Sequence, residues 1–258
     1  MMPIALTIAG SDPSGGAGIQ ADLKTFHQFG IYGQAAITLL TVQNTRGVTA
    51  IETLAPDFVT AQIRAVVEDI PPHAVKTGAL GTRAIVEAVA FEIASIPCPV
   101  VVDPVMISKH GAPLISDDAR QALIAMLLPR AALIMPNLHE AEVITGLPVT
   151  NLHQMQDAAR ALVALGAKAV LIKGGHLEGV AIDVLHDGQH LHTYPAPRIE
   201  TVHTHGTGCT YSAAITALLA RGLSLADALP RAKHYITEAI RTNPGLGHGQ
   251  GPVNHFAF

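Results

Sequence analysis

The chain has 258 residues, of which 49% are apolar and 14% charged, and its formal net charge is −4. This composition supplies a large core but no clusters of Lys and Arg, so we expect no nucleic-acid partner. No apolar run reaches the roughly 18 residues that span a bilayer, so we expect no membrane segment. The two cysteines, Cys98 and Cys209, are too few for a disulfide framework, and no secretory signal precedes the first apolar segment. We therefore expect a cytoplasmic protein.

Short apolar runs alternate with longer segments of helical periodicity along the chain. The predicted strands cover residues 4–9, 35–41, 74–77, 99–102, 133–135 and 169–172. The predicted helices cover residues 17–29, 56–69, 82–96, 117–127, 138–145, 151–165, 209–221 and 224–243. This alternation predicts one α/β domain over residues 1–258, with a mostly parallel sheet and helices on both faces. Residues 180–194, with Asp187-Gly188 at a tight turn, predict two antiparallel edge strands.

Polar and glycine-rich segments follow five of the predicted strands. They are residues 10–18, 43–47, 103–106, 137–140 and 173–176. Ligands of such sheets bind beyond the carboxyl ends of the strands, so we expect a concave site at this edge.

The segment 204–215, Thr-His-Gly-Thr-Gly-Cys-Thr-Tyr-Ser-Ala-Ala-Ile, leads from a glycine-rich loop into a helix of small residues. The backbone amides of Gly206, Thr207, Gly208 and Cys209 could converge on an anion at the positive end of that helix, and phosphate is the natural occupant. A tight strand-to-helix turn is the alternative interpretation of the Gly-x-Gly tripeptide taken alone. Neither a Walker phosphate loop nor a dinucleotide-binding Gly-x-Gly-x-x-Gly occurs elsewhere. The fourteen histidines lack the paired spacing of a zinc site, which favours surface and loop roles.

Taken in order, these segments resemble the hydroxymethylpyrimidine/phosphomethylpyrimidine kinases of thiamine biosynthesis, in the ribokinase-like superfamily. The resemblance is carried by residues 9–22, 43–47, 103–106, 137–140, 173–176, 204–209 and 251–256. It implies a three-layer α/β/α sandwich with a mostly parallel sheet and a small antiparallel edge. It also implies ATP and Mg²⁺ as cofactors and a homodimer. The implied reaction phosphorylates 4-amino-5-hydroxymethyl-2-methylpyrimidine, and then its monophosphate to the diphosphate.

The resemblance places Gln43 against the pyrimidine, where its amide offers a donor and an acceptor to a ring nitrogen and an exocyclic amine. Without the resemblance, Gln43 is an ordinary capping or turn residue. The resemblance implies a pocket that also includes Gly10, Ala17, Asp22, Ala79 and Val105.

For the nucleotide, the resemblance implies that Asp103 and Glu140 hold Mg²⁺, in part through water, and that Lys173 meets the ATP phosphates. It places Asn137, Thr204 and His205 beside the same cofactors. Acids at strand ends are often helix caps instead, and this alternative is strongest for Glu140. Residues 109–111, Lys-His-Gly, are interpreted as part of a flap over the reaction.

Cys209 stands where many ribokinase-like enzymes have a catalytic Asp, as in the pyrimidine kinases. We expect its thiol pKa to be lowered at the helix N-terminus, so that it takes the proton of the acceptor hydroxyl or orients that hydroxyl. A small residue selected for packing is the alternative. Cys98, between Pro97 and Pro99, is interpreted as a packing residue.

Ala79 departs from the family pattern, which has methionine at this position of Lys76-Thr77-Gly78-Ala79-Leu80. The smaller side chain opens space for a larger 2-substituent or a pyridoxal-like ring. A pyridoxal or pyridoxine kinase of the same superfamily is therefore one alternative function. A non-catalytic pyrimidine-binding protein is another, although such a protein would not need Asp103, Glu140 and Lys173 together.

Overall fold

One nine-stranded sheet forms the centre of the protein in a computed structural model, which describes residues 2–107, 111, 113–175, 177 and 179–257. The strands are β1 (Ile4–Ser11), β2 (Tyr32–Asn44), β3 (Gly47–Thr53), β4 (Ala74–Thr77), β5 (Val100–Val102), β6 (Leu133–Ile134), β7 (Val170–Ile172), β8 (Ala181–His186) and β9 (Leu191–Ala196). Their order in the sheet is β3-β2-β1-β4-β5-β6-β7-β8-β9. The pairs from β2 to β7 are parallel, while β3 at one edge and β8 and β9 at the other pair antiparallel.

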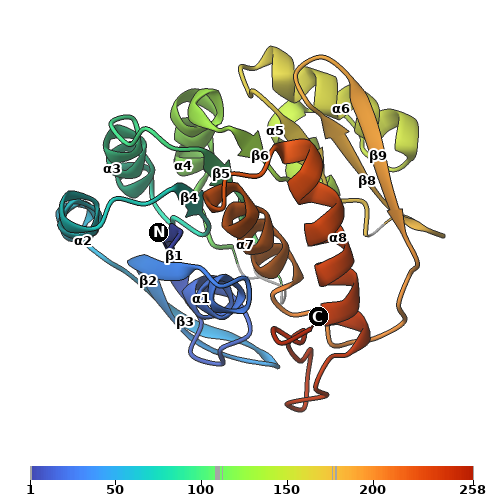
Figure 1. The fold of residues 1–258 in the computed structure, drawn as a ribbon, viewed down its shortest axis with the longest axis horizontal. Helices are drawn as coiled ribbons and strands as arrows, with labels where there is room; N and C mark the ends of the chain where they lie inside the picture. The colour runs from blue at the N-terminus through green and yellow to red at the C-terminus, as the bar shows by residue number, and fades with distance from the viewer. Residues whose placement is uncertain (1, 108–110, 112, 176, 178, 258) are drawn as a thin grey trace.

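Helices cover both faces of the sheet (Figure 1). They are α1 (Gly18–Gln28), α2 (Pro56–Asp69), α3 (Arg83–Ile93), α4 (Asp117–Ala122), α5 (Leu138–Thr145), α6 (Leu152–Ala164), α7 (Thr207–Ala220) and α8 (Leu225–Arg241). One apolar core lies beneath α1, α7 and α8, and the other beneath α2 to α6. The three-layer arrangement confirms the predicted fold class. No helix of the described chain has the length and apolar character that crossing a bilayer requires.

The ends of several predicted elements differ from the structure by one to three residues, and two differences change the description of the fold. Residues 43–47 were expected to be a loop after the second strand, but β2 extends to Asn44 and turns directly into β3. The β3 strand escapes prediction because most of its residues are exposed, so no apolar face marks it. The predicted helix 117–127 continues after α4 as a π-helical turn, Leu123–Leu127, and a 3₁₀ turn, Leu128–Arg130. The hairpin predicted for residues 180–194 is present as β8 and β9.

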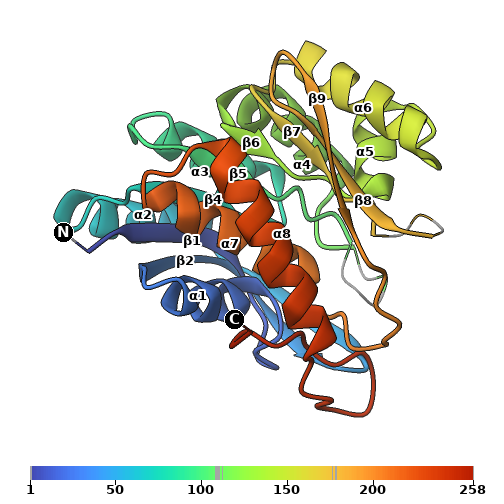
Figure 2. The ribbon, with the colours of Figure 1, turned by 45° about the vertical axis from the view of Figure 1, so that its right-hand side comes forward.

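The loops that follow the parallel strands lie at one edge of the sheet. Helix α7 runs across the middle of the sheet beside β4 and β5, and Figure 2 shows it packed between α8 and the strands. The bridge between Asn137 and Lys173 joins the loops that follow β6 and β7. The expected convergence of the polar segments is therefore present for the loops after β6 and β7, and a contact between Lys173 and Asp103 joins the loop after β5 to them.

Candidate active site

Lys173, directly after β7, is the centre of a buried charge cluster. Its Nζ atom lies 2.8 Å from Asp103 Oδ1 and 4.0 Å from Glu140 Oε2. Burial alone would lower the pKa of Lys173, but the Asp103 and Glu140 carboxylates raise it above its ordinary value. The lysine is therefore a fixed positive charge at the carboxyl edge of the sheet.

Glu140 combines a helix cap with a place in this cluster. The Asn137 side chain accepts from the Glu140 amide, and Glu140 Oε2 accepts from the Asn137 amide at 2.7 Å, which forms a capping box at the start of α5. The prediction that Glu140 caps a helix is thus confirmed. Burial raises the pKa of Glu140 to about 7, although Lys173 opposes that rise. A nearby cation that neutralises its charge would favour the ionised form.

The carboxylates of this cluster fit a Mg²⁺ ion that is coordinated mainly by phosphate oxygens. Asp103 and Glu140 supply carboxylate oxygens, which are the hard ligands that Mg²⁺ prefers. In the described part of the chain, no group of three or more His, Cys, Asp or Glu side chains is arranged to hold a metal. Two carboxylates are enough protein ligands for a Mg²⁺ ion whose other ligands are water and nucleotide phosphates.

The first turn of α7 lies beside the same cluster. A Cβ atom on Gly208 would lie 3.6 Å from both Asp103 Oδ2 and Lys173 Nζ. Gly206, the N-cap, has φ 75°, and a Cβ there would overlap the Gly16 carbonyl oxygen, so this position requires glycine. Among the described residues, no side chain caps α7. Of the four amides predicted to face an anion, that of Thr207 donates to the Thr204 carbonyl at 3.3 Å, and its hydroxyl bonds the same oxygen.

Cys209 lies on this first turn and is partly exposed. Lys76, Asp22 and Asp103 act electrostatically on its thiol. The expected lowering of its pKa is wrong: burial raises the pKa of Cys209 to about 11, and the attraction of Lys76 does not reverse that effect. At neutral pH Cys209 is therefore a thiol, which donates a hydrogen bond and is a poor base.

Lys76 and Asp22 form a fully buried ion pair close to Cys209. Lys76 Nζ lies 2.7 Å from both carboxylate oxygens of Asp22, and Thr7 Oγ1 donates to Asp22 Oδ2 at 2.6 Å. Burial alone would lower the pKa of Lys76, but Asp22 raises it above the ordinary value. The resemblance placed Asp22 in the substrate pocket, and in the structure its side chain is fully buried against Lys76 and Thr7. Sequence reasoning missed the role of Lys76, because a lysine inside a strand carries no signal of its partner.

Gln43 and His205 meet at the other side of the site. His205 is buried, and its Nε2 atom lies 2.7 Å from Asp12 Oδ2 and 3.3 Å from Gln43 Nε2. The Asp12 carboxylate also accepts from the Ser14 amide, the Ser14 hydroxyl and the Ala17 amide. The structure therefore places His205 beside the predicted pyrimidine residue Gln43, whereas the sequence placed it with the nucleotide. Asp12 is a second residue of the site that sequence reasoning missed.

Of the remaining predicted residues, Gly10 lies near the end of β1, and Ala79 and Val105 lie on loops that follow β4 and β5. The Ala79 carbonyl accepts from Thr38 Oγ1 at 2.6 Å, the Val105 amide donates to the Asp103 carbonyl, and a Cβ on Gly10 would lie 2.6 Å from Leu39. The predicted flap residues Lys109 and His110, and His176 of the 173–176 segment, lie outside the described residues.

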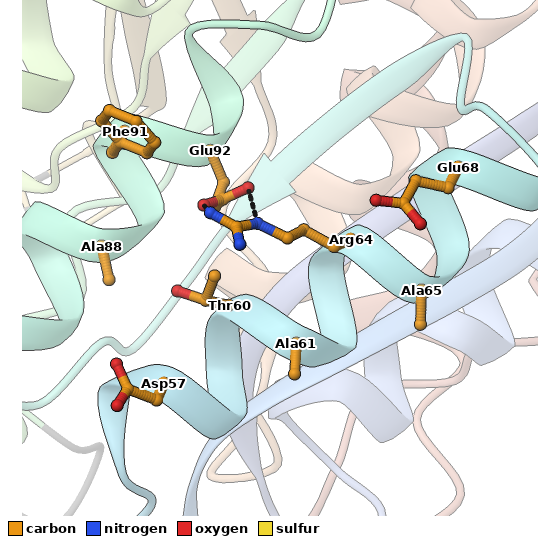
Figure 3. Close-up of a pocket in the computed structure, with 9 residues that line it drawn as sticks. All are labelled: Asp57, Thr60, Ala61, Arg64, Ala65, Glu68, Ala88, Phe91 and Glu92. Atoms are coloured by element: carbon orange, nitrogen blue, oxygen red, sulfur yellow. Dashed lines mark hydrogen bonds and ion pairs between the residues drawn. The ribbon is translucent and has the colours of Figure 1, made fainter.

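A hollow on the helical surface is separate from this cluster. It lies between α2 and α3, and Figure 3 shows the Arg64 guanidinium reaching from α2 to the Glu92 carboxylate on α3. Its lining residues are Asp57, Thr60, Ala61, Arg64, Ala65, Glu68, Ala88, Phe91 and Glu92. None of the predicted site residues is among them, so this hollow is not the site derived from the sequence.

Comparison with known proteins shows the family of the chain. The family model described as phosphomethylpyrimidine kinase matches residues 12–254. The hydroxymethylpyrimidine/phosphomethylpyrimidine kinase of Synechococcus elongatus is 48% identical over 257 residues, which cover 99% of this chain and 98% of that protein.

Two solved structures are also similar. The phosphomethylpyrimidine kinase from Clostridium difficile 630 is 46% identical with a TM-score of 0.82, and the match covers 92% of this chain and 99% of that one. The Bacillus subtilis pyridoxal kinase, solved as an ADP complex, is 40% identical with a TM-score of 0.92, and the match covers 100% of this chain and 98% of that one. From the family match and these identities, the chain is a kinase that belongs to the phosphomethylpyrimidine kinase family.

Proposed function

We propose that this chain transfers the γ-phosphoryl group of ATP to 4-amino-5-hydroxymethyl-2-methylpyrimidine, and then phosphorylates the monophosphate to the diphosphate, in thiamine biosynthesis. The observation that carries the proposal is the meeting of Lys173, Asp103 and Glu140 with the first turn of α7 at one edge of the sheet. Phosphoryl transfer needs positive charge and amide donors around the transferred group, and this edge supplies both.

The nucleotide side of the reaction follows from these groups. The amides of Gly208 and Cys209 belong to the first turn of a helix, where they lack intrahelical partners and the helix dipole is positive. We assign them to the γ-phosphoryl oxygens, with Lys173 as the neutralising cation. Asp103 and Glu140 would hold Mg²⁺, which supplies further neutralisation of the phosphate charge when it is bound.

The acceptor side is assigned to Gln43 and Cys209. Gln43 would bind the amine and ring nitrogen of the pyrimidine, which directs the hydroxymethyl group toward the start of α7. With a pKa of about 11, the Cys209 thiol keeps its proton at neutral pH and would orient the acceptor hydroxyl. A loose phosphoryl-transfer transition state forms little bond to the acceptor, so a strong base contributes little to its formation.

A pyridoxal kinase is the second candidate, favoured by Ala79. This small residue stands where the pyrimidine kinase pattern has methionine, and the similar Bacillus subtilis structure is named a pyridoxal kinase. Phosphorylation of pyridoxal uses the same nucleotide groups, so the two candidates differ only at the acceptor.

A mass-resolved product assay with Mg-ATP separates the candidates. The purified protein is incubated in parallel with the hydroxymethylpyrimidine, its monophosphate and pyridoxal. Diphosphate formed from the monophosphate supports the proposed function, and product from pyridoxal alone assigns the second candidate. No product from any of the three rejects both.

The proposal includes a cytoplasmic homodimer with a single kinase domain, which is what the family resemblance implies. Light scattering of the purified chain at several concentrations tests the dimer, and a mass of one chain at all of them rejects it.

A further inference from the structure

The contact between His205 and Asp12 determines which nitrogen of the imidazole carries a proton. Nε2 of His205 lies 2.7 Å from Asp12 Oδ2, and an ionised carboxylate only accepts hydrogen bonds. Burial alone would raise the pKa of Asp12, but the hydrogen bonds from His205 and Ser14 lower it below its ordinary value. Asp12 is therefore ionised at neutral pH, and His205 Nε2 is the donor whether the ring is neutral or charged.

A protonated Nε2 in turn determines the orientation of the Gln43 side chain. The amide atom nearest to His205 Nε2, at 3.3 Å, is placed as the nitrogen of Gln43, so that two donors would face each other. The oxygen and nitrogen of a side-chain amide are distinguished only by their hydrogen-bond partners. Exchanging the two atoms removes this contact between two donors: the Nε2 hydrogen is donated mainly to Asp12 at 2.7 Å, and it faces the Gln43 oxygen at 3.3 Å as the longer arm of a three-centre hydrogen bond.

Thr41 independently supports the same exchange. Its hydroxyl lies 3.0 Å from the Ser11 carbonyl oxygen and 3.2 Å from the other Gln43 amide atom, placed as oxygen. With the hydroxyl hydrogen donated to the nearer Ser11 oxygen, the Thr41 and Gln43 oxygens would face each other with no donor between them. After the exchange, the Gln43 nitrogen donates to Thr41, and Thr41 donates to Ser11, so every group has a matching partner.

A carboxamide fixed in this way presents its donor and acceptor in one order only. An aminopyrimidine edge offers a ring-nitrogen acceptor beside an amine donor, whereas the corresponding oxopyrimidine edge offers an N–H donor beside a carbonyl acceptor. If the Gln43 side-chain amide could rotate by half a turn, it would match either edge. If its orientation is fixed for the aminopyrimidine edge, then on the oxopyrimidine edge its donor faces a donor and its acceptor faces an acceptor. Unmatched polar groups in a buried site strongly reduce binding.

We propose that His205, held by Asp12, fixes the orientation of the Gln43 carboxamide and thereby makes the site select an aminopyrimidine edge over the corresponding oxopyrimidine edge. His205 is in this sense a positioning residue for specificity. The inference rests on the proposed function, because it requires an aminopyrimidine at Gln43.

Two substitutions of His205 separate positioning from a merely structural role. In His205→Gln, the amide nitrogen replaces Nε2 and still donates toward Gln43, whereas the shorter side chain of His205→Asn places its amide where Nδ1 was. The control is His192→Asn, which removes an exposed histidine that contacts Asp187 on the edge hairpin. For each protein, kcat/KM is measured with the hydroxymethylpyrimidine and with its 4-oxo counterpart, together with the KM for ATP.

We expect the wild type, His205→Gln and His192→Asn to prefer the amino compound, and His205→Asn to lose that preference by roughly 10- to 100-fold with little change in the KM for ATP. An unchanged preference in His205→Asn, or an equal loss in His205→Gln, would overturn the inference. Turnover of neither pyrimidine by the wild type would instead reject the proposed function. Long-range ¹⁵N–¹H correlation spectra test the positioning without activity: we expect a protonated Nε2 on His205, and an unprotonated Nε2 overturns the inference.

Discussion

Lys173 Nζ lies 2.8 Å from Asp103 Oδ1, although the two residues are 70 positions apart in the sequence. The contact joins the loops after β5 and β7, and Glu140 from the start of α5 lies 4.0 Å from the same nitrogen. One cation thus serves two carboxylates. Binding of a phosphate would give this cation a further anionic partner.

Replacing Lys173 with methionine tests that assignment. We expect kcat/KM for ATP to fall by about 10²- to 10³-fold, because one preorganised donor to the phosphoryl group is lost. The KM for the pyrimidine should change little. Lys168→Met, at an exposed lysine shortly before β7, is the matched control. Equal kinetics for the two variants would remove Lys173 from the phosphate site.

Gly174 and Gly175 offer a second test of the loop that carries Lys173. The Gly174 amide donates to the buried Asp183 carboxylate at 3.0 Å, and a Cβ atom at this position would overlap the Ile182 carbonyl oxygen. We expect Gly174→Ala to lower the free energy of unfolding by about 1–3 kcal/mol and to raise the KM for ATP. For Gly175, no described atom lies within 4 Å of such a Cβ, so Gly175→Ala should leave both quantities nearly unchanged. Urea unfolding and ATP titration measure the two effects, and similar behaviour of the two variants would contradict this account of the loop.

The sequence predicted the elements whose pattern is local. The spacing of apolar residues gave the buried parallel strands and all eight main helices, with α2 and α5 matching residue for residue. The exposed strand β3 lacks such a pattern. The loops after β5, β6 and β7 were predicted to meet because parallel strands end at one edge.

Partners far apart in the chain could not be predicted in the same way. The contact between His205 and Asp12 spans 193 positions, and that between Lys76 and Asp22 spans 54. The Cys209 pKa was predicted in the wrong direction because a helix N-terminus is visible in the sequence, whereas the burial that outweighs it is not.

The buried pair of Lys76 and Asp22 predicts a large effect on stability. Asp22→Asn leaves the Lys76 ammonium buried without a counter-charge, so we expect a loss of about 3–5 kcal/mol in the free energy of unfolding. The double variant Lys76→Met/Asp22→Leu should lose less, because neither charge remains. The exposed pair Arg83 and Glu87 is the control, and its disruption should change stability much less. Urea unfolding of the four proteins gives the comparison, and a double variant less stable than Asp22→Asn would show that the desolvation argument fails here.

The raised pKa of Cys209 predicts a specific pH dependence of alkylation. The thiolate is the reacting form, and with a pKa of about 11 its fraction rises about tenfold for each pH unit between about 7 and 10. We therefore expect the rate of Cys209 alkylation by iodoacetamide to rise across this range without a plateau. Burial also raises the pKa of Cys98 to about 11, so the experiment uses Cys98→Ser protein, with peptide mass spectrometry to locate the label.

In Lys76→Met, we expect alkylation of Cys209 to be slower than in the protein that keeps Lys76, because the positive charge of this lysine favours the thiolate. The Lys76→Met/Asp22→Leu variant removes the favourable lysine and the unfavourable carboxylate together, and it is therefore the matched control for Lys76→Met. A plateau near pH 7 in otherwise unchanged protein would mean that Cys209 is already ionised there. In that case a general-base role would replace the orienting role that the neutral thiol supports.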